Sequence, residues 1–169
     1  SHFLEHTPDL EAVLNNPTYR LNLPMLARVL DLSTWPDAQC FYTQNGVRYC
    51  ERVGLEMLPP MSDLQQYDAL VLLTGFGAVM RQGSEHFHPD VAGFYHLPYI
   101  TVEVAHRVAA AAISVLAIDC VTVECQTQGH PLLMTGDVHP VLLGHEPPVF
   151  ILEGVAGDRI APQAGFVPT

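Results

Sequence analysis

The sequence predicts an α/β fold in which a mixed β-sheet packs against flanking helices. Two continuous apolar runs, residues 69–73 and 114–119, have the length and composition of strands that are buried on both faces. Residues 101–112, which lie between them, carry apolar side chains at helical spacing. Strand, long loop, helix and strand in this order form a βαβ-like arrangement, which favours a sheet covered by helices.

The first half of the chain is expected to contribute two strands and little helix. Residues 27–32 predict a strand, because their apolar run ends at a turn-like Ser-Thr-Trp-Pro sequence. A short helix or turn is expected within residues 53–64, which two prolines interrupt. The strand at 69–73 is followed by a long loop, residues 76–99, which is rich in Gly, His and Phe. Loops of this length in compact domains tend to be functional, so we predict that this loop forms a wall or lid of a site.

The second half predicts a helix, a strand, a helical turn and a last strand. Thr101 is the candidate N-cap of the helix. Residues 138–143 predict a helical turn or edge segment, and residues 149–153 a strand that ends in Glu153. The strand at 114–119 also ends in a carboxylate, Asp119, for which a turn-capping role is expected.

Length, composition and charge narrow the class of protein. A chain of 169 residues that is 49% hydrophobic fits one domain, residues 1–169, with a sizeable core. No stretch predicts a membrane helix or a secretory signal, so we expect a cytoplasmic protein. The formal net charge of −11 disfavours nucleic acid and anionic membranes as partners. The four cysteines form no Cys-x-x-Cys pair, and we expect them to be buried, reduced thiols.

His139 and Glu153 give the sharpest chemical signal among the residues. His139 opens the predicted helical turn, and Glu153 ends the last predicted strand. A neutral imidazole and a carboxylate suit zinc or manganese as metal ligands. Taken alone the pair is weak evidence, because surface histidines and glutamates are common and nine histidines are present.

Several ordered motifs resemble the metal-dependent cyclase-like hydrolases, the family of kynurenine formamidase and isatin hydrolase. Residues 70–76 (LVLLTGF) look like the family's strand that ends in Thr-Gly-Trp or Thr-Gly-Phe, and residues 114–119 (SVLAID) look like its Val-Gly-Ile-Asp strand. Residues 139–144 (HPVLLG), followed by Ile-Leu-Glu at 151–153, look like its His-x-x-Leu-Leu-Gly segment and glutamate. The opening residues 23–33 also resemble the strand that follows the family's first motif.

The resemblance implies a swivelling β/β/α fold and a metal-dependent hydrolase of a small amide, N-formyl arylamine or lactam. Zinc or manganese would be held by His139 and Glu153, and the oligomer would be a homodimer or homotetramer. Ser1-His2-Phe3 matches only the tail of the family's principal His-rich motif, so His2 would be the acid/base histidine. The other ligands of that motif would lie ahead of Ser1, and the family's closing segment would lie beyond Thr169.

Substrate contacts are expected from the loop at 76–99. Its aromatic side chains suit a flat substrate, although core filling explains some of them equally well. Its His-x-His pair is expected to have a loop role or to face substrate. The substrate-binding candidates are Phe76, His86, His88 and Phe94.

The spacing between His139 and Glu153 is longer than in the family pattern. The additional residues are those of a Gly-His-Glu-Pro-Pro turn, so His145 or Glu146 could compete with His139 for the metal. Two other hypotheses stay open. One is a catalytically inactive family member that acts as a binding or structural protein, and the other is an acidic domain that holds one structural ion through unrelated histidines.

Overall fold

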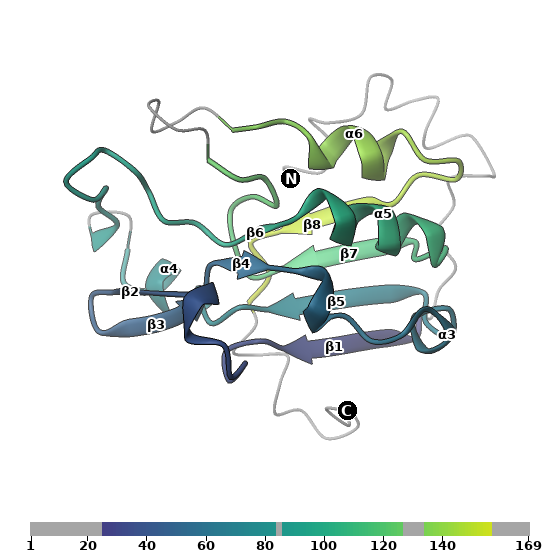
Figure 1. Cartoon of the computed structure of the whole chain (residues 1–169), viewed down its shortest axis with the longest axis horizontal. Helices are drawn as coiled ribbons and strands as arrows, with labels where there is room; N and C mark the ends of the chain where they lie inside the picture. Colours follow the sequence, from purple (N-terminus) through teal and green to yellow (C-terminus); the bar gives the residue numbers. More distant parts are fainter. Residues whose placement is uncertain (1–24, 84–85, 127–133, 157–169) are drawn as a thin grey trace.

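The computed structural model describes residues 25–83, 86–126 and 134–156, and Figure 1 shows their arrangement. The strands are β1 (Ala27–Asp31), β2 (Phe41–Gln44), β3 (Val47–Cys50), β4 (Arg52–Val53), β5 (Ala69–Leu73), β6 (Tyr99–Ile100), β7 (Val115–Ile118) and β8 (Phe150–Glu153). The helices are η2 (Ala38–Cys40), η3 (Leu55–Met57), α3 (Met61–Leu64), α4 (Gly77–Met80), α5 (Val102–Ala110) and α6 (Val138–Leu143).

The central sheet has the strand order β1-β5-β7-β8, and every neighbouring pair in it is parallel. The α/β class is therefore confirmed. The prediction of a mixed central sheet is wrong for the described strands. Each of its strands is joined to the next by a crossover that brings the chain back to the same end of the sheet, which makes the strands parallel.

Antiparallel pairing is found instead in a separate hairpin of β2 and β3. The two strands are joined by Asn45 and Gly46, whose φ angles are 50° and 76°. Two positive φ angles in an Asn-Gly turn are typical of tight hairpins, because this turn matches the twist of the strands. The hairpin strands therefore pair with each other and do not extend the central sheet.

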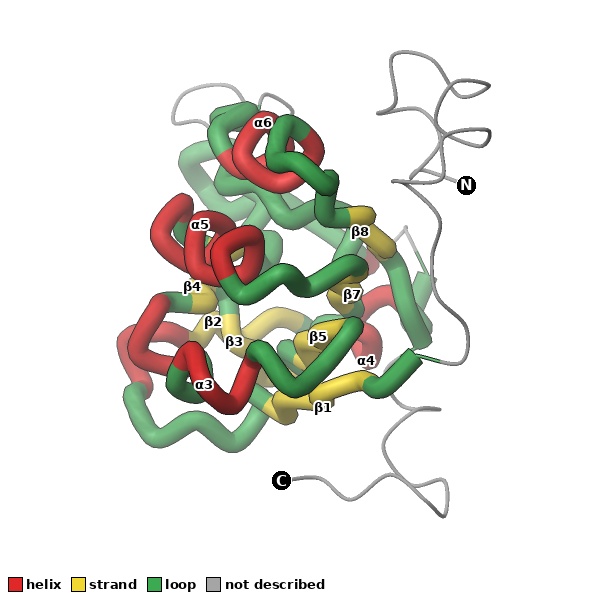
Figure 2. Tube along the Cα trace, turned by 90° about the vertical axis from the view of Figure 1, so that its right-hand side faces the viewer, coloured by secondary structure: helices red, strands yellow, loops and turns green. Residues whose placement is uncertain are grey.

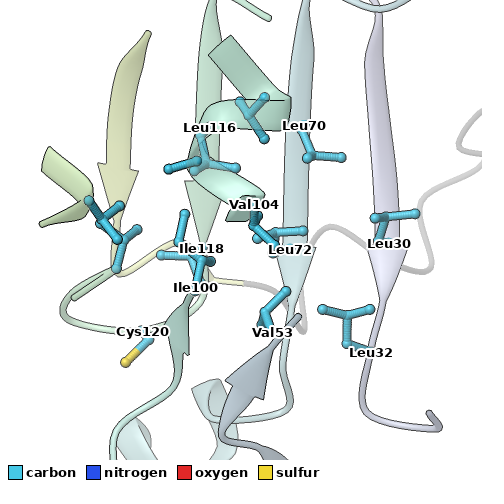
Figure 3. Packing of buried hydrophobic residues seen from close by; sticks show 14 of the residues in the cluster. Leu30, Leu32, Val53, Leu70, Leu72, Ile100, Val104, Leu116, Ile118 and Cys120 are labelled. Atoms are coloured by element: carbon cyan, nitrogen blue, oxygen red, sulfur yellow. The ribbon is translucent and has the colours of Figure 1, made fainter. Parts of the chain in front are cut away.

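The main core lies between the sheet and helices α5 and α6, which cover the same face (Figures 1 and 2). Because side chains alternate along a strand, every second residue of β5 and β7 points to this face. These residues are Leu70, Leu72, Leu116 and Ile118, and all four are fully buried. Val104 of α5 packs among them (Figure 3). The intervening residues, such as Val71 and Ala117, form a smaller cluster on the opposite face.

Helix α5 confirms the predicted helix and its N-cap. The Thr101 hydroxyl accepts a hydrogen bond from the Val104 N–H at 3.4 Å. Helix α5 ends at Ala110, two residues before the predicted end. Ala112 follows with φ at 58°, a left-handed conformation that stops the helix.

Replacing Thr101 by alanine is expected to lower the free energy of unfolding by about 1 kcal/mol, because the N-cap acceptor of α5 is lost. Chemical denaturation of the two proteins measures the difference. Thr101→Ser retains the hydroxyl and is expected to stay within about 0.5 kcal/mol of the original protein. Equal losses in both variants would contradict the capping role.

The other predicted elements agree with the structure within one or two residues, except in the long loop. This loop contains the short helix α4, and it leads into the two-residue strand β6.

The four cysteines are all free. Cys40, Cys50 and Cys120 are buried, and Cys125 is partly exposed. In the described part of the chain, no helix has the length and hydropathy needed to cross a membrane.

Candidate functional site

The candidate site lies where the parallel strands β7 and β8 end. The carboxyl ends of neighbouring parallel strands meet at one edge of a sheet, which is where sites form in α/β proteins. Residues 119–126 leave β7 at this edge, and Glu153 is the last residue of β8. Helix α6 lies between these two strands in the sequence, and His139 is its second residue.

His139 and Glu153 face each other across this edge, as the sequence predicts. The distance from His139 Nε2 to Glu153 Oε1 is 3.6 Å. Residues two apart on a strand point the same way, so Glu153 lies on the same face of β8 as Ile151. Helix α6 covers this face. The two side chains are only 16% and 4% exposed. The pair is therefore a buried imidazole and carboxylate that converge on one point.

Glu124 holds the other side of the His139 ring, and it is not among the site residues predicted from the sequence. Its Oε1 atom lies 2.8 Å from His139 Nδ1 and accepts hydrogen bonds from the backbone N–H groups of His139 and Val138, at 2.8 and 3.0 Å. Its Oε2 atom accepts from the Thr135 hydroxyl at 3.0 Å and from the Asp137 N–H at 3.1 Å. Both oxygens of a side chain that is 3% exposed are thus occupied by protein donors.

These contacts favour the ionised form of Glu124. Burial raises the pKa of this carboxyl group. The hydrogen bonds from the His139 ring, from the backbone of His139 and Val138, and from Thr135 outweigh burial and lower the pKa to about 2. Donors at the first turn of α6 stabilise an anion there, since the amides at a helix start have no partner within the helix. Glu124 is therefore a fixed negative charge beside His139.

Asp119 has the turn-capping role that the sequence predicts. Its Oδ1 atom accepts hydrogen bonds from the Thr74 N–H at 2.8 Å and the Thr74 hydroxyl at 2.6 Å. Its Oδ2 atom accepts from the Gly75 N–H at 3.0 Å. Gly75 has φ at +94°, a conformation that side chains rarely adopt. Asp119 thus fixes the turn after β5, from which the loop at 76–99 departs.

An apolar pocket of about 170 Å³ borders this edge of the sheet. It is lined by one glycine and six apolar side chains: Phe76, Val79, Met80, Gly83, Phe87, Leu97 and Val121. Val121 belongs to the segment that also carries Asp119 and Glu124. A Cβ atom placed on Gly154, the residue after Glu153, would lie 4.0 Å from the Met80 methyl group. The pocket therefore borders the segment that follows β7.

The structure separates the four predicted substrate contacts into two groups. Phe76 lines the pocket, where it meets Phe87 edge to face with ring centroids 5.7 Å apart. His86 and His88 are exposed, and their carbonyl groups accept hydrogen bonds from Asn45 and Gln44 of the β2–β3 hairpin.

Phe94 is partly exposed, its N–H donates a hydrogen bond to Asp90 Oδ1, and its carbonyl oxygen accepts one from the Asp90 N–H. This part of the loop is tied down by His96, another residue that the sequence did not single out. His96 Nδ1 lies 2.6 Å from Glu51 Oε2, and His96 Nε2 lies 2.9 Å from Asp90 Oδ2. The described contacts of His86, His88 and Phe94 thus hold the loop in place, and a contact with substrate stays a prediction for them.

The two competing ligands, His145 and Glu146, are exposed in the turn after α6. His145 Nδ1 lies 3.0 Å from the Pro147 carbonyl oxygen, and the side chain lines a groove between α5 and α6. His139, and not His145, therefore faces Glu153. His2, the predicted acid/base residue, lies outside the described residues.

The geometry of the pair fits a divalent cation. Two ligands that each lie about 2.1 Å from a tetrahedral zinc ion are about 3.4 Å apart, close to the observed Nε2–Oε1 separation. Within residues 25–83, 86–126 and 134–156, no three His, Cys, Asp or Glu side chains form a group that could hold a metal ion. Glu124 adds no third ligand, because its oxygens already accept from protein donors. Metal binding by His139 and Glu153 thus stays a prediction.

A scan against protein-family models and a search of curated proteins find no match to this chain. The resemblance to cyclase-like hydrolases therefore stays a prediction that rests on the sequence motifs.

One feature of the sequence could have identified Glu124 as a site residue. It is a lone carboxylate in a mostly apolar segment that directly follows a buried strand, where side chains of parallel sheets converge. That signal does not give its partner, because His139 follows only after 15 residues.

Proposed function

We propose that this protein is a metal-dependent hydrolase of a small amide, N-formyl arylamine or lactam, as in arylformamidases. The observation that supports this most is the buried His139–Glu153 pair, with 3.6 Å between Nε2 and Oε1 at the carboxyl edge of the sheet. His139 and Glu153 would be two ligands of a zinc or manganese ion. Such an ion, when bound, would supply Lewis-acid polarisation of a carbonyl group and a lowered pKa for bound water.

The surrounding residues support a role in binding and orienting substrate. The pocket of about 170 Å³ is close in volume to an engineered apolar cavity of about 150 Å³ that binds benzene. Phe76 and Phe87 provide ring faces and edges for an aromatic group. The pocket is therefore suited to the aromatic ring of an arylamide.

Metal content and turnover test the proposal on the full-length native protein. We expect hydrolysis of formanilide-type or cyclic amides that a chelator abolishes and zinc or manganese restores. His139→Ala and Glu153→Ala should each reduce bound metal at least about tenfold, because each removes a ligand. His145→Ala is the matched control, since it removes an exposed histidine near the same helix, and its metal content should not change.

Two results would reject the proposal. One is turnover that persists in chelator, and the other is full metal content in both ligand variants. A native protein that binds small aromatic amides without hydrolysing them would instead support the alternative hypothesis of a catalytically inactive binding protein.

A further inference from the structure

We infer that Glu124 is a positioning residue that fixes the orientation and the tautomer of His139 for cation binding. This inference rests on the proposed function for its purpose, but the contacts that carry it belong to the chain itself. Two features are decisive: the direction in which each nitrogen of the His139 ring points, and the groups that occupy the Glu124 oxygens.

A single oxygen atom holds His139 at two points. Glu124 Oε1 lies 2.8 Å from the backbone nitrogen of His139 and 2.8 Å from its ring Nδ1. The backbone contact fixes the residue at the start of α6, and the ring contact fixes the rotation of the imidazole. A ring that was held only by its backbone could turn about its side-chain bonds and carry Nε2 away from Glu153.

The same contact selects the tautomer. Both Glu124 oxygens accept hydrogen bonds from backbone N–H groups, so the neutral ring must carry its proton on Nδ1 to bond with Oε1. The Nε2 atom, which lies on the side of Glu153, then presents its lone pair. A metal ion binds the unprotonated nitrogen of histidine, and ligating histidines usually donate their other N–H group to a carboxylate or carbonyl. Glu124 therefore prepares Nε2 for a cation.

Two adjacent residues position both members of the pair. The Val123 N–H donates a hydrogen bond to Glu153 Oε1 at 3.0 Å, while Glu124 bonds to the His139 ring. Val123 is fully buried, and the segment lies between the ends of β7 and β8. The Val123–Glu124 dipeptide thus contacts both members of the pair, Glu153 through the Val123 backbone and His139 through the Glu124 side chain.

The inference is tested first in the metal-free protein. Nitrogen-15 NMR of the His139 ring, recorded in alkaline buffer where imidazole rings are neutral, reports which nitrogen carries the proton. We expect the proton on Nδ1 in the original protein, and a larger Nε2–H fraction in Glu124→Gln, because a neutral amide is a weaker acceptor. A proton mainly on Nε2 in the original protein would overturn the inference.

Zinc affinity provides the second readout, measured by competition with a metal indicator. Glu124→Gln is expected to weaken binding about 10- to 100-fold. Thr135→Val is the matched control, because it removes a hydrogen bond to Oε2 of the same carboxylate and leaves the contact with His139 intact. We expect Thr135→Val to change the affinity less than about twofold. Equal losses in the two variants would show that Glu124 acts only on stability, and would reject the positioning role.

The two readouts separate the failure of this inference from the failure of the proposed function. If zinc binding is absent or does not depend on His139 and Glu153, the proposed metal site is wrong, and the NMR tautomer still decides whether Glu124 orients the ring. If zinc binds through the pair but the proton lies on Nε2, the metal site stands and the role of Glu124 is rejected.

Discussion

Replacing Asp119 by alanine is expected to lower the free energy of unfolding by about 3–5 kcal/mol, a large effect for a single substitution. The Asp119 side chain accepts three hydrogen bonds from Thr74 and Gly75, and Thr74 is fully buried. Without the carboxylate these donors have no route to water, and each buried donor that loses its partner costs about 1–3 kcal/mol. Chemical denaturation monitored by circular dichroism measures the loss.

Asp31→Ala is the matched control for this prediction. Asp31 ends β1 at the same edge of the sheet, but it is exposed, and its side chain accepts hydrogen bonds from the backbone and hydroxyl of nearby Ser33. Its loss is expected to cost less than about 1 kcal/mol, because water replaces the carboxylate. Asp119→Asn retains the shape of the side chain and one acceptor oxygen, so its loss in free energy of unfolding should be intermediate. This variant should fold even if Asp119→Ala does not. Similar losses for Asp119→Ala and Asp31→Ala would contradict the capping role.

Acid is expected to remove about 3 kcal/mol of stability through Glu124 alone. Its pKa in the folded protein is about 2, against an ordinary value of 4.5. Because the folded pKa is the lower one, the unfolded chain takes up the proton first as the pH falls. The contribution is therefore complete above about pH 4.5 and is lost progressively toward about pH 2.

Urea denaturation between about pH 6 and about pH 2.5 measures this effect, with a chelator present so that bound metal does not contribute. Other carboxylates also titrate in this range, so the informative quantity is the difference between the original protein and Glu124→Gln. That difference should be largest at neutral pH and shrink as the pH falls. Parallel stability curves for the two proteins would show that Glu124 is not stabilised in its ionised form.

The sequence by itself determined the elements whose signals are local. The apolar runs of β5 and β7 predict buried strands because backbone and side-chain preferences act within a few residues. Thr101 predicts the start of α5 for the same reason, since the cap and the amide that it satisfies are three residues apart. The sequence also predicts that Glu153 ends a strand, but it does not predict the distance between Glu153 and His139.

Only the tertiary structure decided which distant residues meet. The pairing of the central strands with one another depends on the path of the crossovers, which no local pattern specifies. Glu124 meets His139 across 15 residues, and the Val123 N–H meets Glu153 across 30. These contacts arise because parallel strands deliver their carboxyl ends to one edge, where burial makes each polar group find a partner.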